Sequence, residues 1–211
     1  VAMLIPAAAD AASANPDWGV FLVSAFLTSF IGGTFILMNR SRFGFLGVRQ
    51  AFVLTTMSWI VIAAFGALPF MFSNLELTYT DAFFEAMSGI TTTGSTVVTG
   101  LDSAPPGILL WRALLQWLGG IGIVVMAIGV LPMLRVGGMQ LFHMESSDQS
   151  DKMMPRAAQI STTIAAIYLL LTAVCFSAYW AAGMSPFDAV AHSMTTIATG
   201  GFSTSDASLG H

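Results

Sequence analysis

Four long apolar stretches constrain this chain more than any other feature of its sequence. They cover approximately residues 18–38, 51–72, 107–134 and 157–182. Each is long enough to cross a hydrocarbon core of roughly 30 Å, which takes about 20 helical residues. Charged residues make up only 9% of the 211 positions, whereas a soluble domain has them at about 25%. The sequence therefore predicts an all-α membrane protein that crosses the bilayer several times.

The basic residues indicate which ends of these spans face the cytoplasm. Six of the seven lie in the connections after the first and third spans, at residues 39–50 and 135–156. The positive-inside rule therefore predicts that both connections are cytoplasmic. The other face is acidic, which either attracts cations or only reflects the exclusion of basic residues from that side. Its acidic residues are Asp17, Glu76, Asp81, Glu85, Asp102, Asp188 and Asp206.

Two segments between the spans resemble each other at a fixed offset of 107 residues. The first runs from Thr78 to Thr96 and the second from Ser185 to Ser203. The pairs of positions that carry the same residue are Asp81/Asp188, Ala82/Ala189, Met87/Met194, Ile90/Ile197, Thr92/Thr199 and Gly94/Gly201. This self-similarity indicates a repeated unit of span, short segment and span.

The repeat divides the chain into four parts. We expect residues 1–48 to be an N-terminal helical segment whose start precedes Val1, and residues 49–134 to be the first complete repeat. Residues 135–155 are expected to be a cytoplasmic linker, and residues 156–211 a second repeat that stops before its second span. On this interpretation the sequence is a piece of a longer protein.

Each short segment begins with a helix-start signal. Thr78 and Asp81, like Ser185 and Asp188, have the hydroxyl-x-x-acid spacing of a capping box. In this motif the hydroxyl accepts from an early backbone N–H, and the acid accepts from the N–H of the capping residue. The predicted helices end near residues 90 and 197. They are roughly 16 Å long at 1.5 Å per residue, so they can enter a bilayer but cannot cross it.

The residues after each short helix suit an extended backbone that lines a pore. Residues 91–96 read TTTGST and residues 198–203 read ATGGFS. Non-helical backbone at membrane depth occurs only when it is buried in protein or lines a wet cavity. Its carbonyl oxygens can replace the water shell of a cation, and the negative C-terminal end of the preceding helix favours the same ion. Either segment alone resembles an ordinary loop, but their repetition after two capped helices favours a cation filter.

Three side chains near these segments allow more than one interpretation. Arg112 is expected to tune how cations reach the pore, to pair with Glu85 or Asp102, or to extend to the membrane interface. Glu85 is expected either to hold the short helix in place or to be a solvated or locally paired carboxylate. His192 is a candidate proton relay, but a polar packing residue is the simpler interpretation because its counterpart in the repeat is Glu85.

Several motifs together resemble the TrkH-type potassium subunits of the Trk/Ktr superfamily. The motifs of the first repeat are DAFFE at 81–85, TTTG at 91–94, LQWLGG at 115–120, LPML at 131–134 and VGGMQL at 136–141. Those of the second are FDA at 187–189 and IATGGFST at 197–204. The resemblance extends from about residue 18 to the end of the chain. It implies four span–pore-loop–span repeats with re-entrant half-helices, arranged with pseudo-fourfold symmetry around one potassium path.

The resemblance also implies the residues and partners of the site. By position, the first filter segment is Thr92, Thr93 and Gly94, and the second is Thr199, Gly200 and Gly201. K⁺ would be held by the backbone carbonyls of Thr92, Thr93, Thr199 and Gly200. The implied activity is K⁺ uptake across a bacterial inner membrane by a homodimer with a cytosolic nucleotide-binding regulatory subunit of the TrkA type. No cofactor and no nucleic-acid partner are expected.

Alternative functions stay open at this stage. A sodium-coupled Ktr- or HKT-type transporter fits the same features, and each filter carries only one matching glycine, so the choice between K⁺ and Na⁺ is left open. An intramembrane enzyme using Asp81, Glu85 or His192 would need paired acids or a metal triad, and the sequence has no such signature. A non-conducting scaffold would leave the two filter-like segments unexplained.

Overall fold

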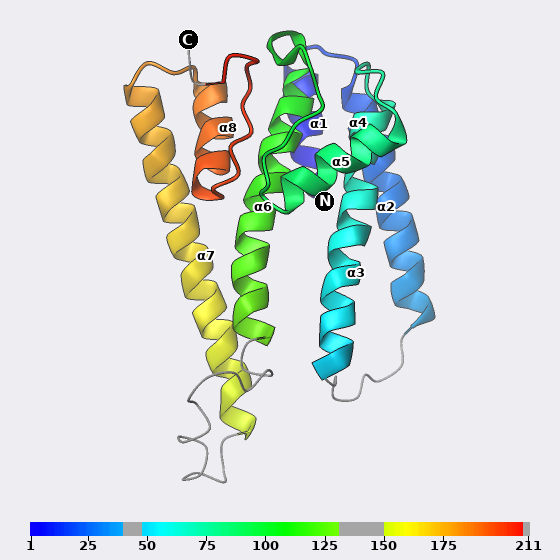
Figure 1. Cartoon of the computed structure of the whole chain (residues 1–211), viewed down its shortest axis with the longest axis vertical. Coiled ribbons are helices and arrows are strands. Elements are labelled where there is room, and N and C mark those ends of the chain that lie inside the picture. Colours follow the sequence, from blue (N-terminus) through cyan, green and yellow to red (C-terminus); the bar gives the residue numbers. More distant parts are fainter. Residues whose placement is uncertain (40–47, 131–149, 209–211) are drawn as a thin grey trace.

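The computed structural model describes residues 1–39, 48–130 and 150–208, and the regular structure in these ranges is helical (Figure 1). The α-helices are α1 (Leu4–Ala12), α2 (Trp18–Met38), α3 (Val48–Gly66), α4 (Leu68–Phe72), α5 (Tyr79–Ile90), α6 (Pro106–Val130), α7 (Ser150–Ala181) and α8 (Pro186–Ile197). A short 3-10 helix, Leu101–Ser103, precedes α6. The predicted all-α fold class is confirmed.

Within the described ranges, four helical stretches are long and apolar enough to cross a membrane. They are Trp18–Met38, Arg49–Phe72, Pro106–Met126 and Gln159–Ala181. These stretches coincide with the four spans predicted from the sequence, and α2 begins and ends at the predicted residues. The prediction of several membrane spans is therefore confirmed.

The second span is divided into two helices, although the sequence predicted one apolar stretch over residues 51–72. α3 ends at Gly66 and α4 begins at Leu68. Pro69 has no backbone N–H, so it cannot donate to the preceding turn as a continuous helix requires. At the break, the carbonyl of Gly66 accepts a hydrogen bond of 2.9 Å from the indole N–H of Trp111 on α6. A side chain from another helix thus satisfies a backbone group at the break.

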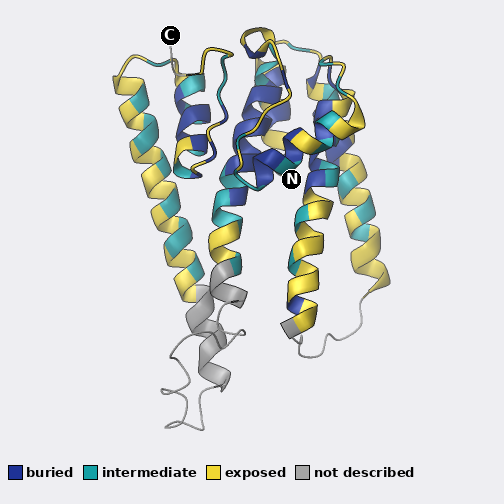
Figure 2. Ribbon diagram, in the orientation of Figure 1, coloured by how far each residue is buried: buried dark blue, intermediate teal, exposed yellow. Residues whose placement is uncertain are grey.

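α6 is the central helix of the described structure. In an 18-residue apolar stretch of α6, 56% of the residues are buried inside the protein, compared with 6% in a stretch of the same length in α7. α6 contacts α1, α5, α7 and α8. Figure 2 shows that buried residues concentrate on α6 and on the short helices around it. A side chain on α6 can therefore reach elements that are far apart in the sequence.

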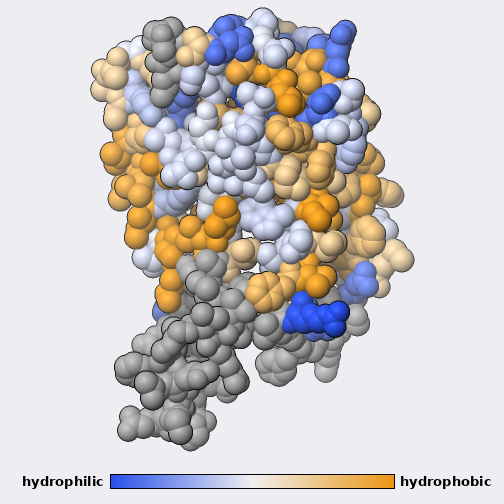
Figure 3. Space-filling model, viewed as in Figure 1, coloured by the Kyte–Doolittle hydropathy of each residue, from blue (hydrophilic) through white to orange (hydrophobic). Residues whose placement is uncertain are grey.

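The outer faces of the long helices are apolar and exposed. Phe26 and Ile36 of α2 are 73% and 72% exposed, and Leu170 of α7 is 63% exposed. Figure 3 shows apolar surface at both sides of the molecule and a more polar region between them, where the segments after α5 and α8 run in Figure 1. The apolar faces are suited to contact lipid or other protein surfaces.

The helix ends next to the two basic connections share one end of the molecule. The C-terminus of α2 and the N-terminus of α3 lie at the same end as the C-terminus of α6 and the N-terminus of α7 (Figure 1). α5 and α8 begin near the opposite end. Most of the two connections, residues 40–47 and 131–149, lies outside the described residues. The arrangement of the helices agrees with the prediction that both connections share one side.

Candidate functional site

α5 and α8 are short helices of 12 residues each, and both end part-way along the longer helices beside them (Figure 1). The segment after each helix returns toward the end of the molecule at which the helix began. Both helices end at the predicted residues, Ile90 and Ile197. The following residues, 91–96 and 198–203, contain no helix. The predicted pattern of a half-length helix and an extended return segment is therefore present twice.

The N-terminus of each short helix is capped by the predicted hydroxyl. The backbone N–H of Asp81 donates to the Thr78 hydroxyl at 3.2 Å, and that of Asp188 donates to the Ser185 hydroxyl at 3.2 Å. Each aspartate carboxylate accepts from the same hydroxyl at 2.6 Å, whereas we expected it to accept from the N–H of the capping residue. Each pair fixes the start of its own helix. The carboxylate accepts from the capping hydroxyl, whereas in a standard capping box it accepts from the backbone N–H of the capping residue.

The C-terminus of each short helix ends in the same hydrogen-bonded turn. After α5, the N–H of Thr92 donates to Gly89 and the N–H of Thr93 donates to Ser88, both at 2.9 Å. After α8, the N–H groups of Thr199 and Gly200 make the equivalent bonds to Thr196 and Thr195, both at 2.9 Å. This pair of bonds defines a Schellman motif. The two segments thus leave their helices along matching paths.

Both turns place a threonine in the left-handed region of backbone space. Thr92 has φ of 57° and Thr199 has φ of 55°. A β-branched residue rarely takes this conformation, which glycine usually provides at a helix C-terminus. Two residues later, Gly94 and Gly201 have φ of 80° and 82°. The backbone therefore turns in the same way in both segments, at the residues predicted to form the filter.

The two segments meet at their glycines. A Cβ atom added to Gly94 would overlap the carbonyl oxygen of Gly200, so the first segment lies directly against the second. A Cβ on Gly200 would overlap the side chain of Gln116 on α6. The Gln116 carbonyl oxygen accepts from the N–H of Phe202 at 3.1 Å. The structure thus brings together segments that are separated by more than 100 residues in the sequence.

Two further glycines let the ends of α5 and α8 approach α6. A Cβ on Gly119 would overlap the carbonyl of Ile90, the last residue of α5. A Cβ on Gly120 would crowd the backbone of Ala198, the residue after α8, and the hydroxyl of Tyr168. Gly119 therefore permits the end of α5 to approach α6, and Gly120 permits the end of α8 to do so. These small residues permit close helix contact at the C-termini of both short helices.

A buried ion pair lies beside the two segments. The Nε of Arg112 on α6 donates to the carboxylate of Glu85 on α5 at 2.7 Å, and the two residues are 1% and 0% exposed. Of the interpretations considered for Arg112, pairing with Glu85 is confirmed. Extension to the membrane interface and a solvated Glu85 are wrong, because both side chains are enclosed between α5, α6 and the return segments.

Most of the chain matches a known protein family. Residues 20–211 match the TrkH family, described as cation transport proteins. The chain belongs to the TrkH family. The resemblance inferred from the sequence is confirmed, and the family is one of transport proteins rather than of enzymes.

Individual relatives of this TrkH-family chain are considerably longer. The Trk system potassium uptake protein TrkH of Escherichia coli (strain K12) is 49% identical over 194 residues, which cover 90% of this chain and 40% of that protein. The TrkH of Vibrio parahaemolyticus is 44% identical over 214 residues, covering 100% of this chain and 44% of that protein. The Trk system potassium uptake protein TrkI of Halomonas elongata is 53% identical over 161 residues, covering 76% of this chain and 33% of that protein.

A solved structure shares the architecture. The crystal structure of the potassium transporter TrkH from Vibrio parahaemolyticus matches with a TM-score of 0.87 at 40% identity, covering 99% of this chain and 42% of that one. The chain described here spans less than half the length of the TrkH proteins that it matches.

α8 has a polar cluster around His192, whose position matches that of Glu85, the member of the ion pair on α5. The hydroxyl of Thr204 donates to the Asp188 carboxylate at 2.7 Å and lies 3.3 Å from Nε2 of His192. His192 is 5% exposed and packs edge-on against Tyr179. The interpretation of His192 as a polar packing residue fits these contacts. A cavity of about 340 Å³ adjoins this cluster and is lined by Asp188, His192 and Thr204 among others.

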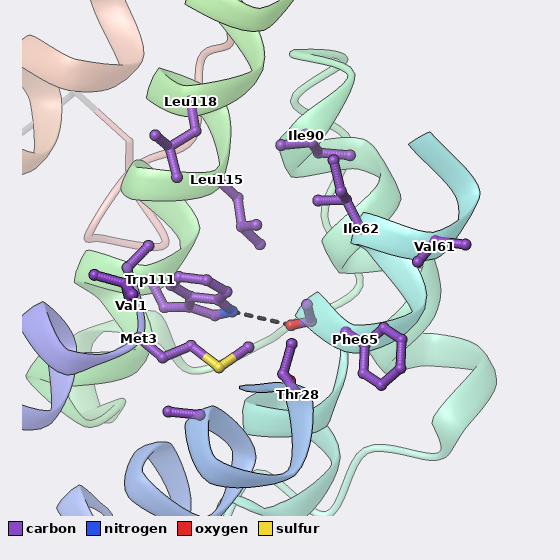
Figure 4. Close-up of a pocket in the computed structure, with 13 residues that line it drawn as sticks. Val1, Met3, Thr28, Val61, Ile62, Phe65, Ile90, Trp111, Leu115 and Leu118 are labelled. Carbon is purple, nitrogen blue, oxygen red and sulfur yellow. Dashed lines mark hydrogen bonds between the residues drawn. The ribbon is translucent and has the colours of Figure 1, made fainter. Parts of the chain in front are cut away.

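Another pocket of the TrkH-family chain is apolar. It has a volume of about 280 Å³ and lies between residues 1–3, α2, α3, the end of α5 and α6. Figure 4 shows its aliphatic and aromatic lining, with the Trp111 indole bonded to the carbonyl at the α3–α4 break. Among the described residues, no group of three or more His, Cys, Asp or Glu side chains is placed to hold a metal ion.

Sequence reasoning missed Gln116 as a site residue. Its side chain is 0% exposed and lies against the second segment. The sequence did indicate it, because Gln116 and Arg112 are polar residues of a largely apolar span and lie one helical turn apart. Residues four apart lie on the same face of a helix. The sequence alone could therefore have indicated a polar stripe on α6 that includes both Arg112 and Gln116.

Proposed function

We propose that the full-length protein takes up K⁺ across a bacterial inner membrane, along a path lined by the backbone carbonyls of Thr92, Thr93, Thr199 and Gly200. The observation that carries the proposal is the matched pair of return segments. Each has a left-handed threonine followed by a glycine with positive φ, and Gly94 of one segment packs against the carbonyl of Gly200 in the other.

The chemistry of a potassium path fits these segments. A K⁺ ion gives up its water shell only where several oxygen atoms replace it, and backbone carbonyls supply them without charge. The short helices direct their C-terminal ends, each equivalent to about −0.5 charge, toward the start of the segments. The relatives that share 44% to 49% identity carry potassium uptake in their names.

The repeat suggests how the path is completed. We take residues 49–134 as one span–pore–span repeat, residues 156–211 as part of a second, residues 135–155 as a linker and residues 1–48 as an N-terminal segment. Two pore segments surround only part of an ion. The matched relatives are more than twice as long as this chain, which fits four repeats around a pseudo-fourfold axis.

The resemblance to TrkH-type subunits extends the proposal to topology and partners. In this account the basic connections, residues 39–50 and 135–156, face the cytoplasm, as the positive-inside rule favours. Their flanking helix ends share one side of the molecule, which supports the same side for both. The protein forms a homodimer and binds a cytosolic nucleotide-binding regulatory subunit of the TrkA type. Cysteine labelling of single-cysteine variants in these connections, with intact and opened cells, tests the sidedness.

Uptake of Rb⁺ by a strain that lacks its own potassium uptake systems tests the function. The full-length protein should restore Rb⁺ uptake, and Gly94→Ala should lower it by at least about tenfold, because both the positive φ and the Gly200 carbonyl oppose a side chain. Gly33→Ala is the matched control, since a Cβ there meets nothing within 4 Å.

The outcome separates the candidate functions. Wild-type uptake in Gly94→Ala, at wild-type protein amounts, would contradict the filter assignment. Rb⁺ uptake that requires external Na⁺ would instead favour the sodium-coupled alternative.

A further inference from the structure

We propose that Arg112 is a positioning residue that locks the two pore segments to each other, and that Glu85 anchors it. The proposal rests on the proposed function, because it gives these residues a role in setting cation affinity and selectivity. Neither residue contacts the ion in this account. Both act by fixing the backbone whose carbonyls do.

The guanidinium of Arg112 makes three hydrogen bonds in three directions. Nε donates to Glu85 at 2.7 Å, one terminal nitrogen donates to the hydroxyl of Thr96 at 3.0 Å, and the other donates to the carbonyl of Ser203 at 2.7 Å. Thr96 belongs to the segment after α5, and Ser203 belongs to the segment after α8. One side chain therefore bonds to the pore segments of both repeats.

Glu85 serves the first segment as well as the arginine. Its carboxylate accepts from the hydroxyl of Thr96 at 3.0 Å and from the backbone N–H of Val97 at 2.9 Å. The carboxylate thus ties α5 to the return of its own segment. Because it is fully buried, its charge has to be matched nearby, and Arg112 provides that match. The pair adds no net charge beside a path for cations.

The second segment holds Arg112 through a further contact. The guanidinium carbon lies 4.2 Å from the centre of the Phe202 ring, which is the geometry of a cation–π interaction. The N–H of the same residue donates to Gln116, one turn along α6 from Arg112. Phe202 and Ser203 are consecutive residues, so α6 fixes this part of the second segment from two positions.

A planar guanidinium is required for this arrangement. Lysine carries the same charge, but its ammonium is a compact point at the end of a flexible chain and cannot reach three separated acceptors in one plane. Long-range attraction of cations or anions is a poor explanation of the pair, because both side chains are buried and their charges cancel. Arg112→Lys therefore removes the planar set of donors and keeps the positive charge.

The experiment measures the concentration dependence of Rb⁺ uptake by the full-length protein carrying Arg112→Lys, and its inhibition by Na⁺. We expect the half-saturating Rb⁺ concentration to rise about tenfold, the loss typical of one charge-assisted hydrogen bond. Na⁺ should inhibit more strongly, and the maximal rate should stay within about twofold, since the path itself is intact. Arg49→Lys is the matched control, because Arg49 is exposed.

A second variant keeps the proposal testable if Arg112→Lys does not accumulate in the membrane. Thr96→Val removes the hydroxyl that bonds to both members of the pair and keeps the shape of the side chain. It should raise the half-saturating Rb⁺ concentration about tenfold, because the hydroxyl bonds to two charged groups. An unchanged Rb⁺ affinity and an unchanged Na⁺ inhibition, in whichever variant is present at wild-type amounts, would overturn the proposal.

The two proposals fail in different ways. Loss of uptake in Gly94→Ala together with wild-type affinity in Arg112→Lys would reject only the positioning role. Wild-type uptake in Gly94→Ala would reject the filter itself, whatever the arginine variant does.

Discussion

Thr92 and Thr199 occupy a backbone conformation that disfavours their own side chains. Left-handed backbone costs a residue with a Cβ roughly 1–2 kcal/mol, and a β-branched residue is among the least suited to it. Both threonines follow a short helix at the same position of a Schellman motif, where glycine would be the ordinary choice. Strained backbone of this kind clusters at functional sites. We interpret the pair as residues that hold the start of each pore segment in one defined path.

Thr199→Gly should make the full-length protein more stable. The side chain of Thr199 is exposed, so its removal loses little packing, and glycine releases the strain of the left-handed backbone. We expect a gain of about 1 kcal/mol in the free energy of unfolding, seen as a higher melting temperature of the purified protein. The matched control Thr56→Gly, in the exposed middle of α3, should lower it by about 0.4 kcal/mol, since glycine is a poorer helix former than threonine. Equal losses in both variants would contradict the interpretation of Thr199.

At the scale of helices, the sequence was informative about elements and less so about their contacts. The ends of α5 and α8 could be predicted, because the hydroxyl and aspartate at each start and the glycine-bearing segment after each end are local signals. The break between α3 and α4 was not predicted, although Pro69 marks it, because residues 51–72 form one continuous apolar stretch. The partner of each glycine on α6 could not be predicted, because it depends on which helices pack there.

Gly119→Ala tests the closest of these helix contacts. A methyl group at this position would overlap the carbonyl of Ile90 at the end of α5, so α6 and α5 have to move apart. Overpacking of this kind costs about 1–3 kcal/mol, and we expect a lower melting temperature together with weaker Rb⁺ uptake. The control is Gly32→Ala on α2, where a Cβ meets nothing within 4 Å. A variant Gly119→Ala that melts and transports like Gly32→Ala would show that α5 and α6 are not in close contact.

At the scale of the whole molecule, the described helices are arranged around α6, and its N-terminus is held by the first helix of the chain. The carboxylate of Asp10 on α1 accepts from the backbone N–H of Gly107 at 2.6 Å, and Asp10 is 0% exposed. Contacts of this kind, like that between Arg112 and Ser203, join residues 91 or more positions apart. Sequence patterns report neighbours along a helix, so these long-range bonds became apparent only from the structure.

Asp10 makes the stability of this arrangement depend on pH. Burial raises the pKa of Asp10 above its ordinary value of 3.8, the bond from Gly107 opposes this, and the charge of Asp17 adds to it. A carboxyl with a raised pKa in the folded state contributes its full stability below the ordinary pKa and loses it as the pH rises through the raised value. Asp10→Asn keeps an acceptor for Gly107 and does not ionise. Its melting temperature should therefore rise relative to that of the wild type as the pH increases from 4 to 8.

Asp10→Ala separates the cap from the charge. It removes the acceptor at the start of α6 as well as the charge, so it should be about 1 kcal/mol less stable than Asp10→Asn at every pH in this range. A constant difference between the melting temperatures of the wild type and Asp10→Asn across the range would contradict a raised pKa.

The proposed function requires that the segments after α5 and α8 bind the transported cation through their backbone oxygens. Anomalous diffraction from crystals of the full-length protein soaked in Rb⁺ can locate the bound ions. We expect an anomalous peak in direct contact with the carbonyl oxygens of Thr92, Thr93, Thr199 and Gly200. Peaks found only at carboxylates such as Asp102 or Asp206, with none against these four carbonyls, would contradict it.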